Sequence, residues 1–347
     1  MKPTQWLAAW GTILKGHAPM LSIEITRECP LSCPGCYAYG DDHLGGATKL
    51  SELKDFRGDE LVSGVIGLVE KHKPLHVSLV GGEPLMRHKE LSRILPVLSR
   101  MGKFTMVVTS AVIPIPQEWM EIDRLTVAVS VDGLPAEHDV RRKPATYERI
   151  LRNIEGRRVN IHTTITQQML NRPEYLDEFV GFWNARSEVN RFWISLYTPQ
   201  VGEESAERIT PESRASLAYL LPELKKKFPK VLMNEGFAQA FLDPPESPSE
   251  CTFSQMSVNY SADLRTRVEP CIFGGEPDCS TCGCAVSAGF HWAGNYKIAG
   301  PLNVRHLVNA SIAVGTTVNR VRTRNDGDTR WHGTPVRERA KLTQIEL

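Results

Sequence analysis

The sequence predicts an α/β protein whose main part is a partial (β/α)6 TIM-like barrel, followed by a small cysteine-rich appendage. Between Leu21 and about Thr198, short β-branched runs alternate with longer helical patterns, which is typical of a parallel sheet covered by helices. The length of 347 residues, 41% of them hydrophobic, allows one large core with a small addition. Five cysteines lie close together near the end of the chain, where aliphatic residues are few.

Six strands and four connecting helices account for the barrel. The strands are expected at 21–26, 75–80, 103–109, 124–131, 159–166 and 191–198, and the helices near 51–72, 87–101, 145–157 and 173–188. Right-handed crossovers curl such a sheet, but six units are too few to close an eight-stranded barrel. We therefore expect an open barrel with its site in the loops that follow the strands.

Beyond the barrel, the sequence predicts two further regions. A helical stretch at 211–228 ends before the proline-rich segment DPPESPSE at 243–250, which is typical of a linker. We expect a barrel at 1–242, an appendage at 243–290 and a helical, polar tail at 291–347. In that tail an amphipathic helix at 304–322 is expected to pack against the barrel through one apolar face, formed by Val304, Leu307, Val308, Ile312 and Val318. A lipid-facing or substrate-covering role for this face is the alternative.

Charge and composition exclude several classes of protein. Lys and Arg total 41 against 40 Asp and Glu, so no overall field is available to hold nucleic acid or an anionic membrane surface. No apolar run is long enough to form a transmembrane segment, and the first residues lack the pattern of a signal peptide. We expect a cytoplasmic protein without a nucleic-acid partner, in which the eight cysteines serve metal or redox chemistry rather than disulfides.

Three of the cysteines, Cys29, Cys33 and Cys36, follow the first predicted strand in a loop that contains Pro and Gly. A cubane of four irons usually takes four thiolates, and this loop offers three. The remaining iron would be free for a chelating ligand such as S-adenosylmethionine (SAM). The alternative is a zinc site, which needs a fourth ligand. His43 is the nearest candidate, but structural zinc sites usually pair their ligands in two short knuckles.

The C-x3-C-x2-C spacing after a first strand resembles the radical SAM superfamily. The resemblance implies an oxygen-sensitive [4Fe-4S] cluster, held by Cys29, Cys33 and Cys36, that cleaves SAM to a 5'-deoxyadenosyl radical. A reductant such as flavodoxin or ferredoxin would supply the electron. One departure is Gly35, which stands where the family commonly has an aromatic residue, so Tyr37 is the candidate ring for the adenine contact.

The end of the second predicted strand resembles a SAM-binding motif of the same superfamily. The segment LHVSLVGGEP ends in Gly81, Gly82, Glu83 and Pro84. The resemblance implies that the backbone and the acidic side chain of this GGEP motif meet the amino group of SAM. An ordinary strand-to-helix turn is the alternative explanation, because glycines also suit tight turns.

Later strand ends add polar candidates. Ser130 and Asp132, in SVDG, resemble the S-x-D-G motif, which implies contacts with the ribose hydroxyls or the carboxylate of SAM. Thr109, at the end of the third strand, and Thr164, on the fifth, would extend this polar lining. Threonine is common in strands for structural reasons, which is the alternative for these two residues.

A second group of thiols near the C-terminus has the pattern C-x19-C-x7-C-x2-C-x-C and consists of Cys251, Cys271, Cys279, Cys282 and Cys284. This order of parts resembles radical SAM enzymes with a twitch or SPASM appendage, and it implies one auxiliary [4Fe-4S] cluster. Five thiols exceed the four that such a cluster takes, and we expect Cys284 to be the free one. Four cysteines with a C-x2-C knuckle would also satisfy tetrahedral zinc.

The leading hypothesis is a radical SAM enzyme that acts on an organic substrate, either a small metabolite, a lipid or a peptide. The sequence identifies no catalytic residue that would handle this substrate. No leader-peptide-binding domain precedes residue 21, which disfavours a self-contained peptide maturase. The alternative is a non-catalytic zinc or iron-sulfur module that keeps the barrel as a scaffold.

Overall fold

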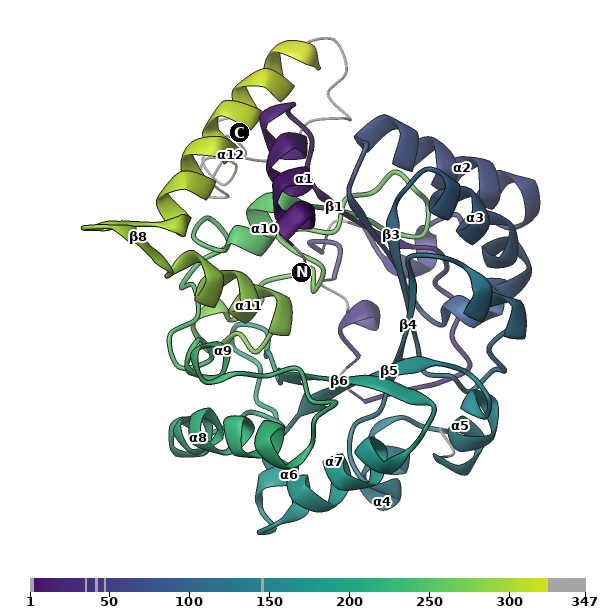
Figure 1. Cartoon of the computed structure of the whole chain (residues 1–347). Coiled ribbons are helices and arrows are strands. Elements are labelled where there is room, and N and C mark those ends of the chain that lie inside the picture. The colour runs from purple at the N-terminus through teal and green to yellow at the C-terminus, as the bar shows by residue number, and fades with distance from the viewer. Residues whose placement is uncertain (1–2, 35, 41–42, 47, 145–146, 324–347) are drawn as a thin grey trace.

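One curved parallel sheet organises the protein. The computed structural model describes residues 3–34, 36–40, 43–46, 48–144 and 147–323, so the end of the expected polar tail lies outside the described residues. The sheet has seven strands in the order β6-β5-β4-β3-β2-β1-β7, all paired in parallel (Figure 1). Its strands are β1 (Met20–Glu24), β2 (His76–Val80), β3 (Phe104–Thr109), β4 (Leu125–Ser130), β5 (Val159–Ile165), β6 (Val189–Leu196) and β7 (Ser257–Tyr260).

The six expected strands are confirmed, and the partial barrel with them, but the sheet contains a seventh strand. β7 lies within the cysteine-rich region and pairs with β1, with Met20 opposite Ser257 and Ile23 opposite Tyr260. The sequence of β7, SVNY, is too short and polar to predict a strand. It becomes one because the edge of β1 offers unpaired backbone groups, and all four β7 residues are buried there. The region expected as an appendage is therefore continuous with the barrel sheet.

Helices cover the outer side of the sheet (Figure 1). Those expected after the strands are α2 (Gly58–His72), α3 (His88–Arg100), α5 (Tyr147–Ile154), α7 (Tyr175–Ala185) and α8 (Pro211–Lys227). Thr210 caps α8 by accepting a hydrogen bond from the Ser213 N–H at 3.2 Å, and Pro211 occupies the first turn. Shorter helices in the connections are α4 (Pro135–Arg141), α6 (Gln167–Leu170), α9 (Glu235–Gln239), α10 (Thr252–Met256) and α11 (Ala285–Gly294).

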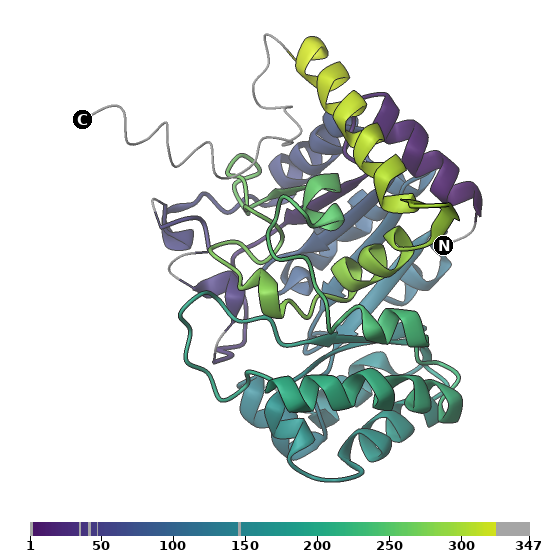
Figure 2. The same ribbon diagram turned by 90° about the vertical axis from the view of Figure 1, so that its left-hand side faces the viewer.

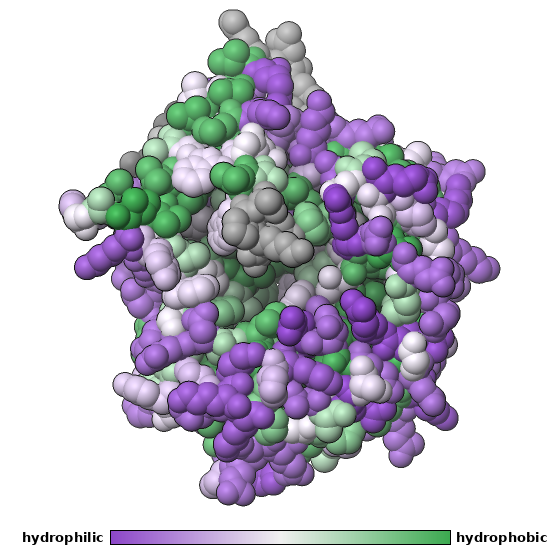
Figure 3. All heavy atoms as spheres, in the orientation of Figure 1, coloured by the Kyte–Doolittle hydropathy of each residue, from purple (hydrophilic) through white to green (hydrophobic). Residues whose placement is uncertain are grey.

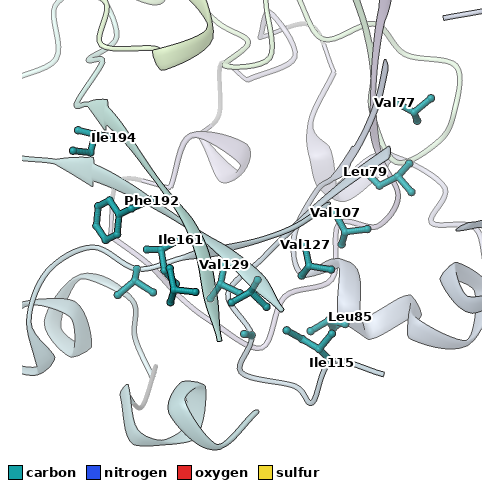
Figure 4. Close-up of a cluster of buried hydrophobic side chains, with 14 of the residues drawn as sticks. Val77, Leu79, Leu85, Val107, Ile115, Val127, Val129, Ile161, Phe192 and Ile194 are labelled. Atoms are coloured by element: carbon teal, nitrogen blue, oxygen red, sulfur yellow. The ribbon is translucent and has the colours of Figure 1, made fainter. Parts of the chain in front are cut away.

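The core lies between the sheet and these helices (Figure 4). Alternate residues of each strand, such as Val107 and Val129, point outward and are fully buried with the apolar faces of the helices. The residues between them point into the barrel, and many of these are polar. His162 is one example, and its imidazole lies 2.9 Å from the Ser195 hydroxyl of the next strand. The inner surface of the barrel is therefore polar although its outer layer is a conventional hydrophobic core.

Two helices from opposite ends of the chain lie side by side (Figures 1 and 2). They are α1 (Pro3–Leu14), which the sequence did not predict, and α12 (Val304–Arg322), whose position was predicted correctly. Polar groups hold the pair together: Trp10 Nε1 donates to Ser311 Oγ at 2.6 Å, and the Asn319 amide donates to the Gly16 carbonyl at 3.0 Å. Ile312 is buried as expected, but Val318 is exposed, because α12 turns its small and polar residues toward α1.

A short hairpin precedes α12. Its strands are β8 (Lys297–Ala299) and β9 (Leu302–Asn303), and every residue of β8 is exposed. In the described part of the chain, no helix has both the length and the apolar character needed to cross a membrane.

Candidate metal and cofactor site

The loop after β1 brings Cys29, Cys33 and Cys36 together. The three thiols are half-buried, and Cys29 and Cys33 pack against the hydrophobic core. Burial, together with the nearby Cys33 and Cys36 thiols, raises the pKa of Cys29 to about 11. A metal would have to displace these protons, as thiolate ligation always requires. Gly35, within the same loop, lies outside the described residues.

Close approach between two loops fixes the start of the cysteine loop. The Gly82 N–H donates to the Thr26 carbonyl and the Glu83 N–H donates to the Glu28 carbonyl, both at 2.8 Å. A Cβ atom on Gly82 would collide with the Glu28 carbonyl. Gly81 has a φ of 125°, which a side chain would strain. The two glycines of GGEP therefore allow the β1 and β2 loops to pack backbone against backbone.

A buried arginine, which the sequence analysis missed, supports the same junction. Arg87 is almost fully buried and donates to Glu28 Oε2 and to Asp55 Oδ2, each at 2.9 Å. The Thr26 hydroxyl also donates to Asp55 at 2.9 Å. Arg87 lies four residues after Glu83 in the sequence GGEPLMR, so its proximity to the motif was the available signal. It orients the residues that lead into the cysteine loop.

The Glu83 carboxylate binds the end of β3. It accepts hydrogen bonds from the Thr109 hydroxyl at 2.6 Å, the Ser110 N–H at 2.8 Å and the Leu85 N–H at 2.9 Å. The last of these starts the short 3-10 helix Pro84–Arg87, with Pro84 in its first turn. Thr109 and Glu83 are thus brought together as a buried pair that joins two neighbouring strand ends.

The S-x-D-G segment forms a second polar junction. Asp132 is buried and accepts from the Arg142 side chain at 2.8 Å, from Arg141, and from the Thr164 N–H at 2.9 Å. Burial opposes ionisation of Asp132, but Arg142 and Arg141 outweigh it and hold the pKa of the carboxyl well below its usual range. Ser130, at the end of β4, is buried opposite His162.

This junction also reaches the cysteine loop. Arg142, Arg141 and Asp132 all lie near enough to influence the pKa of Cys33, which burial raises above its usual value. The two guanidinium groups favour the thiolate. The carboxyl ends of β1, β2 and β4 therefore meet around the three thiols.

A buried ion pair connects the cysteine loop to the C-terminal cysteine region. His43 Nε2 lies 2.7 Å from Glu24 Oε1, at the end of β1, and His43 Nδ1 lies 3.0 Å from the Phe273 carbonyl. The Ser261 hydroxyl donates to the other Glu24 oxygen at 2.7 Å. The Glu24 carboxylate and the Phe273 carbonyl are both hydrogen-bond acceptors. An imidazole protonated on both nitrogens can donate to each of them. Burial lowers the pKa of His43, but the interactions with Glu24 outweigh it and raise the pKa above 6.5.

These contacts bear on the zinc alternative. Both ring nitrogens of His43 are engaged, so the nearest fourth ligand proposed for zinc is directed elsewhere. Within the residues that the structure describes, no three Cys, His, Asp or Glu side chains are arranged to hold a metal ion, and because this includes both groups of cysteines it does not distinguish zinc from a cluster. Tyr37 packs its ring against Phe273 with centroids 5.5 Å apart and against His43 at 5.8 Å, so it also contacts the C-terminal region.

The five C-terminal cysteines line a single pocket: Cys251, Cys271, Cys279, Cys282 and Cys284. About 370 Å³ of space in and in front of it is not filled by atoms, and part of this space is open to solvent. Sulfur atoms in this pocket accept hydrogen bonds from the backbone, from the Ser254 N–H to Cys251 and from the Cys284 N–H to Cys282, both at 3.5 Å. Burial raises the pKa of all the thiols for which a shift is resolved, that of Cys279 to about 12. Gathered thiols with N–H donors fit an iron-sulfur cluster, whose potential depends on such bonds.

Arg214 of α8 adds positive charge beside this pocket. It is buried, and its guanidinium donates to the backbone carbonyls of Phe241 at 2.8 Å, Thr281 at 2.6 Å and Cys282 at 3.3 Å. None of these three partners is a carboxylate. A cluster bound by four thiolates would place negative charge next to the guanidinium. The sequence contains no local signal for this residue, which lies far from the cysteines along the chain.

The matched family agrees with this geometry. Residues 23–182 match the model of the radical SAM superfamily. The match covers less than half of the chain. The matched segment runs from β1 into α7 and contains the three-cysteine loop, the GGEP turn and the S-x-D-G segment. No curated protein matches the chain in sequence.

Solved structures support the fold. Streptococcus suis SuiB bound to S-adenosylmethionine is 16% identical over 74% of this chain and 61% of its own, with a TM-score of 0.52. SuiB bound to the precursor peptide SuiA is 13% identical over 95% and 78%, with a TM-score of 0.56. The anSMEcpe protein with bound AdoMet is 14% identical over 88% and 98%, with a TM-score of 0.54. The chain spans less than two thirds of the SAM-bound SuiB chain.

The Gly82 junction predicts a selective effect of one methyl group. Gly82→Ala should destabilise the protein by about 2 kcal/mol, because the added Cβ pushes the Glu28 carbonyl out of place. Gly67→Ala is the matched control: its Cβ would meet nothing within 4 Å in α2, and alanine should stabilise that helix by about 0.5–1 kcal/mol. Urea unfolding followed by circular dichroism measures both; equal stabilities would contradict the close approach.

The His43–Glu24 pair predicts a pH dependence. Because the folded protein holds the His43 proton more tightly than the unfolded chain, the pair contributes fully below pH 6.5 and its contribution disappears as the pH rises through the folded pKa. His43→Gln should lower the free energy of unfolding by about 3 kcal/mol at low pH and by less at high pH.

Urea unfolding of apoprotein across this pH range tests the pair. His306→Gln is the control, since His306 is exposed and glutamine preserves its helix-capping role. A difference between wild type and His43→Gln that does not change with pH would rule out the protonated pair.

Proposed function

We propose that the protein is a radical SAM enzyme in which Cys29, Cys33 and Cys36 hold a [4Fe-4S] cluster. The observation that carries the proposal is that one loop places Cys29 near Cys33, Cys36 and Glu83 of GGEP, and Cys33 near Asp132 of S-x-D-G, within the segment that matches the radical SAM superfamily model. When bound, the cluster supplies the electron that cleaves SAM. The zinc alternative gains no support from His43, because both of its ring nitrogens are already engaged.

Different residues of the chain would contact SAM and support the residues that contact it. We propose that the backbone of Gly81 and Gly82 and the nearby Ser130 line the cofactor pocket, with the Tyr37 ring beside the adenine. The buried carboxylates act mainly as supports: Glu83, through Thr109, fixes the β2 and β3 ends, and Asp132 holds Thr164. A direct SAM contact by either carboxylate requires it to exchange one of its present hydrogen bonds.

We also propose one auxiliary [4Fe-4S] cluster in the C-terminal pocket, held by Cys251, Cys271, Cys279 and Cys282, with Cys284 as the free thiol. The shared pocket, the N–H donors to sulfur and the adjacent Arg214 guanidinium support it. A fully ligated cluster would transfer electrons to or from the substrate. The cytoplasmic reductant would be a flavodoxin or ferredoxin.

The substrate is proposed only as an organic molecule, a small metabolite, a lipid or a peptide. SuiB has been solved with a precursor peptide and anSMEcpe with the Cp18Cys peptide, but at identities of 13% and 14% they share only the fold with this chain.

SAM cleavage tests the proposed activity. Protein reconstituted with iron and sulfide under anaerobic conditions and reduced with dithionite should release 5'-deoxyadenosine from SAM. The triple variant Cys29→Ala/Cys33→Ala/Cys36→Ala should release none, because the cluster has no ligands. Ser32→Ala, an exposed change within the same loop, should keep the activity. Equal product from the triple variant and wild type would contradict the assignment, and zinc without iron would favour the non-catalytic module.

Arg214 gives a test of the auxiliary cluster. Wild-type protein should contain about eight irons per chain, and Arg214→Gln should fall toward about four, because the cluster loses its neighbouring charge. Arg214→Lys should retain more iron than Arg214→Gln. Arg265→Gln, an exposed change in the same cysteine-rich segment, is the control. About four irons per chain in the wild-type protein would contradict the second cluster. The same iron content in all variants would contradict the role of Arg214 in compensating the charge of that cluster.

A further inference from the structure

One face of the molecule gathers exposed apolar side chains. More than half of the exposed large hydrophobic residues in the described chain lie on α1, α12 and the segment from α11 through the β8-β9 hairpin. Figure 3 shows hydrophobic side chains collected over this part of the molecule. We call this surface the apolar face and define it by its most characteristic members: Leu7, Tyr296, Ile298, Val314, Val318 and Val321.

The solvent-facing side of α12 carries a stripe of valines. Val314, Val318 and Val321 form one stripe at intervals of four and three residues, and Val321 is 74% exposed. The buried side of the same helix carries Ser311 and Asn319 beside Ile312, and the exposed side also carries Arg320. A surface helix normally buries its valines and exposes its serine and asparagine. The exposed valines of α12 would therefore gain free energy by contact with an apolar phase.

The hairpin extends the apolar face outward. Figure 1 shows β8 projecting from the body of the protein. Tyr296 is 67% exposed, and Ile298 and Leu302 are exposed on the two strands of the same hairpin. A projecting strand pair beside a helix makes a convex surface, whereas protein partners usually bury their strongest contacts in pockets. A fluid bilayer accepts convex apolar projections without a matching shape.

The segments that form the apolar face carry positive charges and no acidic residues. Residues 3–17 and 285–322 contain no Asp or Glu, although the whole chain has 40 acidic residues. The cations there include Lys15, Lys297, Arg320 and Arg322. At the C-terminal end of α12, Arg322 and His17 line one pocket together with Lys71 of α2. One acidic residue from outside, Asp243, contacts His291 of α11 at 3.6 Å.

We propose that the apolar face docks the protein onto an anionic membrane surface, with the hairpin and the α12 valines inserted at the level of the headgroups. Basic and apolar residues together are the combination that binds such surfaces, and aromatic side chains such as Trp6 and Tyr296 favour the interface. The net charge of the whole chain is close to zero, so it does not reveal that the apolar face carries only positive charges. The proposal does not depend on the proposed SAM chemistry, which concerns other residues.

Vesicle sedimentation with the full, reconstituted chain tests the proposal. The protein should bind vesicles of equimolar phosphatidylcholine and phosphatidylglycerol, bind pure phosphatidylcholine vesicles at least several-fold more weakly, and lose affinity as salt increases. Ile298→Ser/Leu302→Ser and Val314→Ser/Val318→Ser should each weaken binding about tenfold or more, because each removes two inserted apolar side chains. Lys297→Gln/Arg320→Gln should weaken binding to the anionic vesicles alone.

The control is a matched pair of exposed apolar residues elsewhere. Val201→Ser/Tyr219→Ser removes two side chains of similar exposure and should bind vesicles like wild type. Circular dichroism and the iron content verify that each variant is folded. Absence of vesicle binding, equal loss in the control pair, or burial of Val314 and Val318 in a dimer or a protein complex instead would overturn the proposal. Release of 5'-deoxyadenosine in solution is unaffected by any of these outcomes.

Discussion

The backbone contact between the β1 and β2 loops is the constraint on which the candidate site depends. Gly81 and Gly82 let the strand-end loop of β2 lie directly against residues 26–28, where any side chain would intrude. Arg87 then holds the same residues in place by donating hydrogen bonds to Glu28 and Asp55. A loop with three cysteines has many conformations in isolation, and this anchoring at its root favours the one in which Cys29 lies near Glu83 and Cys33 near Asp132.

The remaining strand ends are tied to this junction by charged groups rather than by apolar packing. Glu83 joins β2 to β3, Asp132 joins β4 to β5, and Arg141 and Arg142 bring that second junction close to Cys33. Buried carboxylates that are fully hydrogen-bonded are rigid, because any movement leaves an acceptor unsatisfied in a low dielectric. These hydrogen bonds therefore hold the strand ends at the mouth of the barrel in fixed positions relative to one another.

Several separate contacts join the C-terminal third of the chain to the barrel. β7 continues the sheet beside β1, the His43–Glu24 pair reaches the Phe273 carbonyl, and α12 lies along α1. The proposed second cluster therefore does not sit on a loosely attached module. Because β7 pairs with β1, the C-terminal cysteine region lies directly beside the strand that leads into the first cysteine loop.

The sequence by itself determined the parallel barrel, the positions of its six strands to within two residues, the position of α12 and both groups of cysteines, because periodicity and short-range spacing are local properties. It did not determine β7, whose four residues become a strand only beside the free edge of β1. It also did not reveal Arg87 and Arg214, whose importance comes from burial next to residues brought close by folding. Net charge suggested an unremarkable surface, but only the tertiary structure joins two acid-free segments, almost 300 residues apart in the chain, into a single face. Long-range juxtaposition of this kind leaves no periodic trace in a sequence, so physical contact in the folded chain had to decide it.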